Sequence, residues 1–259
     1  MRPPGGRVSI SEDSALIALS PDERAIVSQV FAKRARAELC VAAAFAQITR
    51  DLVESGADRA VLELSARAVA DEVRHAGLWL EVASEYGGSA LAWPDAGATE
   101  LPAYSGAEPW LLPALRVVGM SCINETIASV RLRECIDHTD VAGVREAMRE
   151  ILSDEIHHAR MGWAYLASPR VTAELRSAVS AWLVRLLGAN LAALFADVES
   201  TLDGAFVAHG IPSTAQTRAV AAAAVHELVL PGFIEVGIDV TEARAWAERE
   251  LSLGSVQSG

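Results

Sequence analysis

The stretch SDEIHHARMGW, residues 153–163, places an acid and a histidine on what otherwise reads as the apolar face of a helix. Ile151 before it and Tyr165 after it follow the same helical spacing. Glu155 and His158 are three residues apart, and residues at that separation share one face of a helix. An unpaired charge on a buried face is strongly unfavourable. Either this face is wet, or a cation lies between the helices.

Start and stop signals on both sides of this segment divide the chain into helices. Ser20-Pro21-Asp22-Glu23 combines a serine cap, a proline in the first turn and an acid three residues after the cap. Asp140 and Ser168-Pro169 are the expected starts of two later helices. We expect helices over residues 21–54, 58–86, 109–137, 140–166, 168–202 and about 214–231, and a short one from residue 241. No stretch reads as a strand, so the predicted fold class is all-α.

The lengths of the connections indicate how the first four helices are arranged. The links after residues 54 and 137 are short, whereas residues 89–107 form a long crossover rich in glycine and proline. Two helical hairpins joined by a crossover are typical of one kind of four-helix bundle. We expect a single domain over residues 1–259, with the bundle at about 21–166 and a helical extension at about 168–250.

Each of the first four helices has an apolar stripe that a carboxylate interrupts near its middle. On the second and fourth helices a histidine follows the acid one turn later, close enough to bind the same ion. The candidate metal ligands are Glu38, Glu72, His75, Glu125, Glu155 and His158. Oxygen ligands with one nitrogen per ion suit iron or manganese. Two divalent cations would balance four carboxylates, which explains how these charges can be buried.

This arrangement resembles the ferritin-like di-iron carboxylate superfamily, in which one helix of each pair gives a glutamate and the other gives Glu-x-x-His. The match covers about residues 22–166, and the six candidate ligands occur in the order of the family. The resemblance implies a ferritin-like four-helix bundle that binds two iron ions, and a manganese–iron pair fits the same ligands.

Both histidine motifs carry an aspartate directly before the glutamate, in Asp71-Glu72-Val73-Arg74-His75 and Asp154-Glu155-Ile156-His157-His158. The first is similar to the Asp-Glu-x-Arg-His form of the di-iron oxygenases. That resemblance implies that Asp154 orients His75 and Asp71 orients His158, with Arg74 one layer further out. His157 stands where the second arginine of that family would be.

The resemblance further implies a non-haem di-iron oxygenase or oxidase that uses O2 to oxidise a small organic substrate. Glu38 and Glu125 would then be the flexible carboxylates beside the O2 and substrate site. Small residues near these two acids leave room for a substrate: Ala42, Ala43, Ala44, Ser121, Cys122, Ala128 and Ser129. Electrons would come from a separate reductase or ferredoxin, because the sequence has no flavin, nicotinamide or iron–sulfur motif.

Two other functions stay open at this point. One is a ferroxidase, iron-binding or peroxide-reducing ferritin-like protein, and the other is a non-catalytic helical scaffold whose buried acids pair with arginines. The long region after the fourth helix and the lack of a Cys-x-x-Cys pair favour substrate oxidation. The three tyrosines, none close in register to a ligand on its own helix, argue against radical generation.

Composition narrows the partners and the compartment. The formal net charge of −12 and the isoelectric point near 5.0 leave no basic patch for nucleic acid. Three cysteines without paired spacing suit reduced thiols and a cytoplasmic location. The most apolar stretch, residues 219–230, is short and carries His226 and Glu227, so we expect no membrane span. A homodimer is compatible with these features.

Overall fold

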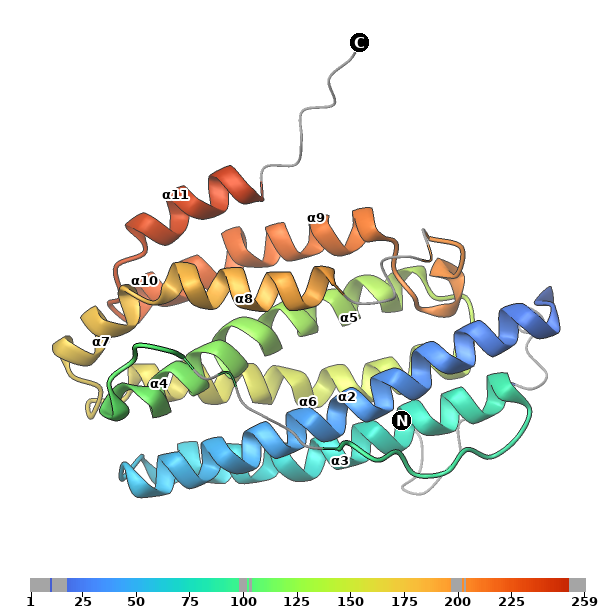
Figure 1. Cartoon of the computed structure of the whole chain (residues 1–259), viewed down its shortest axis with the longest axis horizontal. Coiled ribbons are helices and arrows are strands. Elements are labelled where there is room, and N and C mark those ends of the chain that lie inside the picture. The colour runs from blue at the N-terminus through green and yellow to red at the C-terminus, as the bar shows by residue number, and fades with distance from the viewer. Residues whose placement is uncertain are drawn as a thin grey trace, which may run out of the picture.

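The computed structural model describes residues 10, 18–97, 102, 104–196, 202 and 204–251. Within these residues every regular element is a helix, as the sequence predicts, and no strand occurs (Figure 1). The elements are α2 (Pro21–Glu54), α3 (Arg59–Gly87), η1 (Pro109–Leu111), α4 (Leu112–Val117), η2 (Val118–Glu125), α5 (Thr126–His138), α6 (Ala142–Ala167), α7 (Ala173–Ser180), α8 (Leu183–Phe195), η4 (Val207–His209), α9 (Thr214–Ala224), η5 (Val225–Val229), α10 (Leu230–Glu235) and α11 (Thr241–Glu250).

The first two long helices, α2 and α3, pack along each other as a hairpin (Figure 1). The predicted start of α2 is confirmed by a capping box. Ser20 Oγ accepts from the Glu23 N–H at 3.3 Å, and Glu23 Oε2 accepts from the Ser20 N–H at 2.8 Å. Helix α3 ends where Gly88 adopts φ +70°, the left-handed conformation that favours glycine.

The third predicted helix runs unbroken from Pro109 to His138, but not as a uniform α-helix. Its middle, η2 (Val118–Glu125), is π-helical and ends at one of the candidate ligands. A π turn holds more residues than an α turn, so it changes the face on which the following residues lie. Such segments are rare and are often found at functional sites.

Helix α6 carries the stretch that opened the sequence analysis, but its predicted cap is wrong. The N-cap residue is Val141, and Asp140 makes no side-chain cap. The backbone N–H of Asp140 instead donates to the Ala208 carbonyl at 2.8 Å. This contact holds residue 140 in the loop, and the helix begins at Ala142.

Two expectations for the C-terminal helices are also wrong. The single helix expected over 168–202 is divided into α7 and α8, which meet at a 51° bend, and residues 197–201 lie outside the described residues. Thr172, rather than Ser168, caps α7 and accepts from the Leu175 N–H at 3.1 Å. The expected stop at Pro231 does not occur, because the helix continues from Thr214 to Glu235, with Pro231 directly after the π-helical segment η5 (Val225–Val229).

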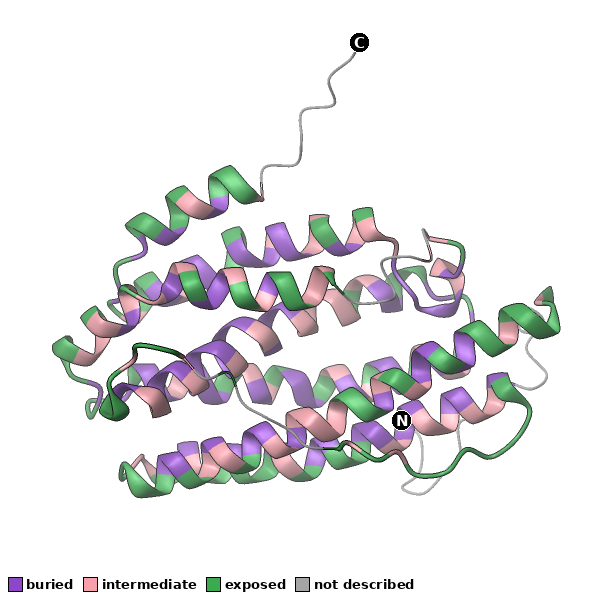
Figure 2. Ribbon diagram, in the orientation of Figure 1, coloured by how far each residue is buried: buried purple, intermediate pink, exposed green. Residues whose placement is uncertain are grey.

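The helices pack in a chain of neighbours that places η2 and α5 in the interior. Helix α3 contacts α2 and α6, α6 contacts η2 and α5, and α8 and α9 cover η2 and α5 (Figure 1). Buried residues recur along each of these helices (Figure 2). The C-terminal region therefore covers the helix that carries Glu125 instead of standing apart from it.

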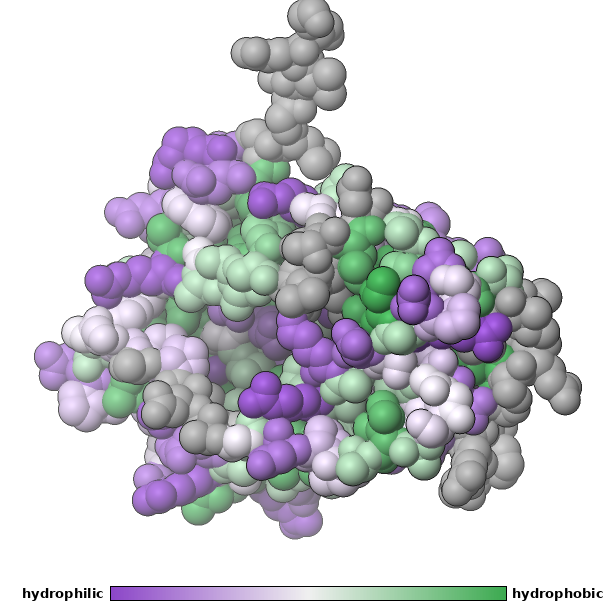
Figure 3. All heavy atoms as spheres, turned by 45° about the vertical axis from the view of Figure 1, so that its right-hand side comes forward, coloured by the Kyte–Doolittle hydropathy of each residue, from purple (hydrophilic) through white to green (hydrophobic). Residues whose placement is uncertain are grey.

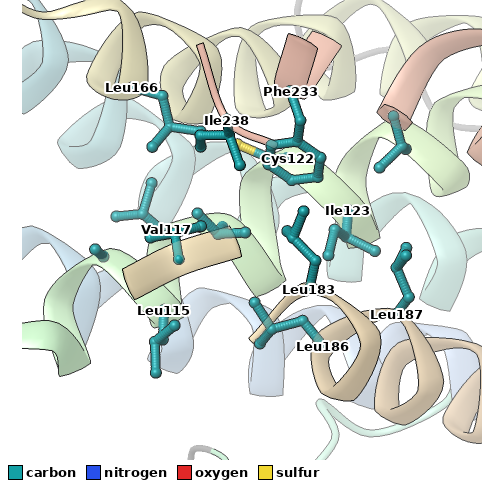
Figure 4. Close-up of a cluster of buried hydrophobic side chains, with 14 of the residues drawn as sticks. Leu115, Val117, Cys122, Ile123, Leu166, Leu183, Leu186, Leu187, Phe233 and Ile238 are labelled. Atoms are coloured by element: carbon teal, nitrogen blue, oxygen red, sulfur yellow. The ribbon is translucent and has the colours of Figure 1, made fainter. Parts of the chain in front are cut away.

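Two clusters of buried apolar side chains fill the molecule. One joins α2, α3, η2 and α6 to the C-terminal helices, as Figure 4 shows for Cys122, Leu166, Leu183 and Phe233. The other surrounds Phe31 near the start of α2. Helices α2, α3 and α6 each pass from one cluster to the other, and their candidate ligands lie between the two. The site is thus a polar layer between two apolar cores.

Length and composition alone would let two helical stretches cross a membrane, Pro109–His138 and Thr214–Glu235. The second is longer than the apolar run recognised in the sequence, because the helix continues beyond Pro231. In the first stretch 67% of the most apolar window is buried inside the protein, and in the second 44%. Hydrophilic residues are interspersed with hydrophobic ones over the face shown in Figure 3.

Candidate metal centre

The six candidate ligands come from four helical segments, with two each on α3 and α6 and one each on α2 and η2. Four of them form a tight buried group in which one ligand atom of each residue lies within 4.8 Å of the others: Glu72, Glu125, Glu155 and His158. This group could hold a metal ion. Its members lie close in space because α6 packs against both α3 and η2.

The remaining two candidates, His75 and Glu38, border this group. His75 Nδ1 lies 3.4 Å from Glu72 Oε2 and 3.4 Å from Glu155 Oε1. Glu38 accepts a hydrogen bond at 2.7 Å from the indole N–H of Trp79. Trp79 is 2% exposed and therefore also belongs to the core.

The two glutamates of the Glu-x-x-His motifs each face both histidines. Glu72 Oε2 is 3.4 Å from His75 Nδ1, and Glu72 Oε1 is 2.9 Å from His158 Nδ1. Glu155 Oε1 is likewise 3.4 Å from His75 Nδ1, and Glu155 Oε2 is 3.0 Å from His158 Nδ1. Each carboxylate therefore directs one oxygen to each imidazole.

The other nitrogen of each histidine faces an aspartate from the opposite motif. His75 Nε2 lies 3.4 Å from Asp154 Oδ2, and His158 Nε2 lies 3.5 Å from Asp71 Oδ2. The first contact is a long hydrogen bond, whereas the second is an ion-pair contact only, since His158 Nε2 has no hydrogen-bond partner among the described residues. Asp71 and Asp154 are 8% and 5% exposed, so they are not surface acids. The pairing is the one that the sequence motifs implied.

Two arginines bridge these aspartates on the outer side. Arg67 donates to Asp71 Oδ2 at 3.1 Å and to Asp154 Oδ1 at 3.0 Å. Arg74 donates to Asp71 Oδ1 at 3.2 Å and also to Asp154 Oδ2, and its other terminal nitrogen donates to Glu150 at 2.9 Å. Both guanidinium groups are about half exposed, so they close the polar layer towards solvent.

Sequence reasoning identified Arg74 but missed Arg67. The family pattern placed a second arginine at the position of His157, whereas the structure supplies one from a different helix. Arg67 precedes Asp71 by four residues, a spacing that puts the two side chains on the same face of α3. That spacing was the available signal.

Burial raises the pKa of two carboxyl groups in the cluster. Burial comes first for Glu38, and the negative charges of Glu72 and Glu155 add to it, so its pKa lies well above the ordinary range. Burial and the charge of Glu155 do the same to the pKa of Glu125. A bound cation would offset both effects by stabilising the ionised form.

The pKa values of the two histidines are raised, although burial alone would lower them. Burial disfavours the charged form of His75, but Asp154 and Glu155 outweigh it and raise its pKa to about 12. Burial also opposes the charge on His158, yet Glu155 and Glu72 raise its pKa to about 10. The positive charge on the imidazoles is the protein's own substitute for a cation at this place.

Several buried atoms of the cluster face an oppositely charged group but make no hydrogen bond of good geometry among the described residues. They are both carboxylate oxygens of Glu72, Nδ1 of His75 and Nε2 of His158. Such atoms are costly when buried without a partner. Carboxylate oxygens and imidazole nitrogens are ligands that iron and manganese accept. The donor set therefore fits divalent cations of this kind.

A glycine allows α6 to approach η2 beside the cluster. A Cβ at Gly162 would lie 2.6 Å from Ser121 Cβ and 2.7 Å from Cys122 Sγ, closer than real contacts. Gly162 follows His158 by one helical turn, and Ser121 and Cys122 precede Glu125 by about one turn. The close approach at this glycine therefore helps to bring the two ligand-bearing segments together.

We expect Gly162→Ala to lower the free energy of unfolding by about 1–3 kcal/mol, because the added methyl group overpacks this contact. The measurement is thermal or urea unfolding, with metal content determined on the same protein. Gly77→Ala on α3 is the matched control, since its Cβ would meet nothing closer than 3.9 Å. Equal stability of the two variants would contradict the role assigned to Gly162.

A cavity of about 250 Å³ opens beside the cluster, between α2, α5 and α8. Glu38, Glu125 and Glu155 line it, which agrees with the expectation of space next to Glu38 and Glu125. Of the small residues expected around this space, Ala128 lies in the cavity wall. Ser121 and Cys122 instead pack against Gly162, because the π segment turns them towards α6.

Comparison with models of known protein families, with curated proteins and with solved structures finds no match to this chain. The structure itself defines the class of site: a buried cluster of glutamates and a histidine, placed between helices, that could hold a metal ion.

Proposed function

We propose that this protein is a ferritin-like di-iron oxygenase that uses O2 to oxidise a small organic molecule. In this proposal α2, α3, η2–α5 and α6 form the four-helix bundle of that class. The observation that carries it is the pair of carboxylates, Glu72 and Glu155, that each direct one oxygen to His75 and the other to His158. Carboxylates shared between two imidazoles are suited to be shared between two metal ions.

The other residues of the site take roles that follow from their positions. Glu38 and Glu125 would each bind one ion at the side that faces the cavity. Trp79 holds Glu38 through its N–H. Asp154 forms a long hydrogen bond with the second nitrogen of His75, and Asp71 faces the second nitrogen of His158 at 3.5 Å. This second contact fixes the ring orientation and makes each imidazole a better ligand. The apolar clusters on both sides exclude water from the layer.

Bound iron would supply the redox chemistry of O2, which protein side chains lack. The protein supplies the carboxylate and imidazole ligands, orients the imidazoles and leaves a cavity for the substrate. Electrons would come from an external reductase or ferredoxin. The cavity lined by Glu38 and Glu125 favours an organic substrate over the ferroxidase alternative, because a ferroxidase requires no such space.

Anaerobic loading with ferrous iron, followed by exposure to O2, tests this proposal. We expect about two irons per chain and a magnetically coupled ferric pair in the Mössbauer spectrum, as two ions sharing ligands require. Isolated ferric ions, or one iron per chain, would contradict a two-ion site. O2 uptake that depends on an organic substrate and a reductant separates an oxygenase from a ferroxidase, which consumes O2 in proportion to added ferrous ion.

We expect Asp154→Asn to weaken metal binding by about 10–100-fold while the helical content is unchanged, a typical effect for a group that holds a metal ligand. The amide is of similar size but has no negative charge to strengthen His75 as a ligand. Calorimetric titration with Mn²⁺ measures the change. Asp137→Asn on α5 is the control, because Asp137 is exposed and pairs with Arg133 away from the site. Wild-type affinity in Asp154→Asn would remove this residue from the site.

A further inference from the structure

The cavity beside Glu38 and Glu125 has a chemical polarity along its length. Its walls include Val41, Ile127 and Leu194, and two of the three glutamates that line it come from α2 and η2. Basic side chains also line the cavity: Lys33, Arg34 and Arg131. One cavity is therefore lined by the candidate metal ligands, by basic side chains and by apolar side chains.

Helix geometry gives the separation of the two kinds of group. Lys33 precedes Glu38 by five residues on α2, and Arg131 follows Glu125 by six residues on the third helix. At 1.5 Å per residue these intervals are about 7.5 and 9 Å along the helix axes. Lys33 and Arg131 are therefore attached about one and a half turns along the helix from the candidate ligand on the same helix.

The basic side chains that line the cavity already have partners within the chain. Arg34 stacks over Phe31 and Trp79 and donates to the Gly210 carbonyl at 3.1 Å, so its guanidinium is already held in place. Lys33 and Arg131 also have other partners within the chain. A substrate would share these groups, since a guanidinium carries five N–H donors. Bound metal would balance the glutamates at the other end of the cavity.

We propose, resting on the proposed function, that the substrate is a small organic acid. Its carboxylate binds Arg131 and Lys33, and the atom to be oxidised lies beside Glu38 and Glu125, about 7–9 Å away if the side-chain ends keep the spacing of their backbone positions. Arginine and carboxylate form strong charge-assisted hydrogen bonds. The apolar walls suit a single ring or a short chain between the two ends, and a cavity of about 250 Å³ has no room for a long lipid.

Binding of a matched acid and amide tests this inference without any turnover. The probes are 4-methylbenzoate and its neutral amide, 4-methylbenzamide, titrated by calorimetry into Mn²⁺-loaded and metal-free protein. We expect the acid to bind at least about 10-fold more tightly than the amide, which corresponds to one charge-assisted hydrogen bond.

Two variants locate the carboxylate. Arg131→Gln should weaken binding of the acid by about 10–100-fold and leave binding of the amide unchanged. Arg133→Gln is the matched control, because Arg133 lies on the same helix, is exposed and pairs with Asp137. Lys33→Gln, at an exposed position on α2, provides a second test should Arg131→Gln fold poorly.

The outcomes separate this inference from the proposed function. Equal affinity for acid and amide, or an acid that binds Arg131→Gln and Lys33→Gln as tightly as the wild type, overturns the inference. The latter result would mean that the carboxylate binds the metal directly. Metal content measured on the same samples decides the proposed function independently. Preference of the metal-free protein for the acid would support the basic end of the cavity even if no metal were bound.

Discussion

Replacing Glu155 by glutamine is expected to weaken binding of both metal ions by more than about 100-fold, beyond the loss typical of groups that merely support a ligand. Glu155 directs one oxygen to each histidine, at 3.4 and 3.0 Å, so a single substitution affects the ligand sets of both proposed ions. Glutamine keeps the shape of the side chain but has no charge, and its NH2 group cannot ligate a cation. Metal content and calorimetric titration with Mn²⁺ measure the effect.

Glu146→Gln is the matched control for this prediction. Glu146 lies on the same helix, is exposed and is not part of the cluster. It should therefore keep its metal and its melting temperature. Circular dichroism of both variants shows whether the helices remain. Full metal occupancy in Glu155→Gln with an intact fold would refute the ligand assignment.

Metal affinity is expected to rise steeply with pH across the neutral range. His75 and His158 have pKa values of about 12 and about 10, so both are protonated at neutral pH in the metal-free protein. A metal ion needs each imidazole neutral, so binding must release at least two protons. Two released protons correspond to about a 100-fold gain in affinity per pH unit. Titration of Mn²⁺ at several pH values, in buffers of different ionisation enthalpy, counts the protons.

The stability of the metal-free protein should change in the opposite direction. A histidine whose pKa is raised by folding contributes stability that is complete below its unfolded value, near 6.5. That contribution is lost as the pH rises towards the folded value of about 10 for His158. The melting temperature without metal should therefore fall between pH 6.5 and 10. A metal affinity that does not vary with pH, or a melting temperature that rises over this range, would show that the histidines are neutral beforehand.

The helices between residues 21 and 167 could be predicted well from local sequence. The capping box at Ser20 and the glycine at position 88 are local signals, and the structure confirms both ends. The predictions failed where a distant contact decided the boundary. The N–H of Asp140 bonds to the Ala208 carbonyl, and Val141 stands at the N-cap of α6. Pro231 does not end its helix, which continues through it directly after the π segment η5.

The candidate ligands could likewise be proposed from spacing, because an acid at a position of the apolar stripe is expected to face the interior of the protein. The aspartates were found in the same way, through their position beside each glutamate. Arg67 was missed, since an arginine on an exposed face looks like any solvated charge until its partners are known. The part of Trp79 in holding Glu38 was missed because its hydrogen-bond partner lies on another helix.

The sequence by itself determined the all-α class, the four interrupted stripes and the residue types available to bind a cation. These properties depend on helical periodicity, which is a local feature of the chain. The tertiary structure alone decided that Glu72 and Glu155 each face both histidines and that Asp154 and Asp71 cross over to the opposite motif. It also decided the π segment before Glu125 and the basic end of the cavity. The physical reason is that side chains from helices far apart in the sequence meet only where packing sets their relative level and rotation, as the contact at Gly162 does here.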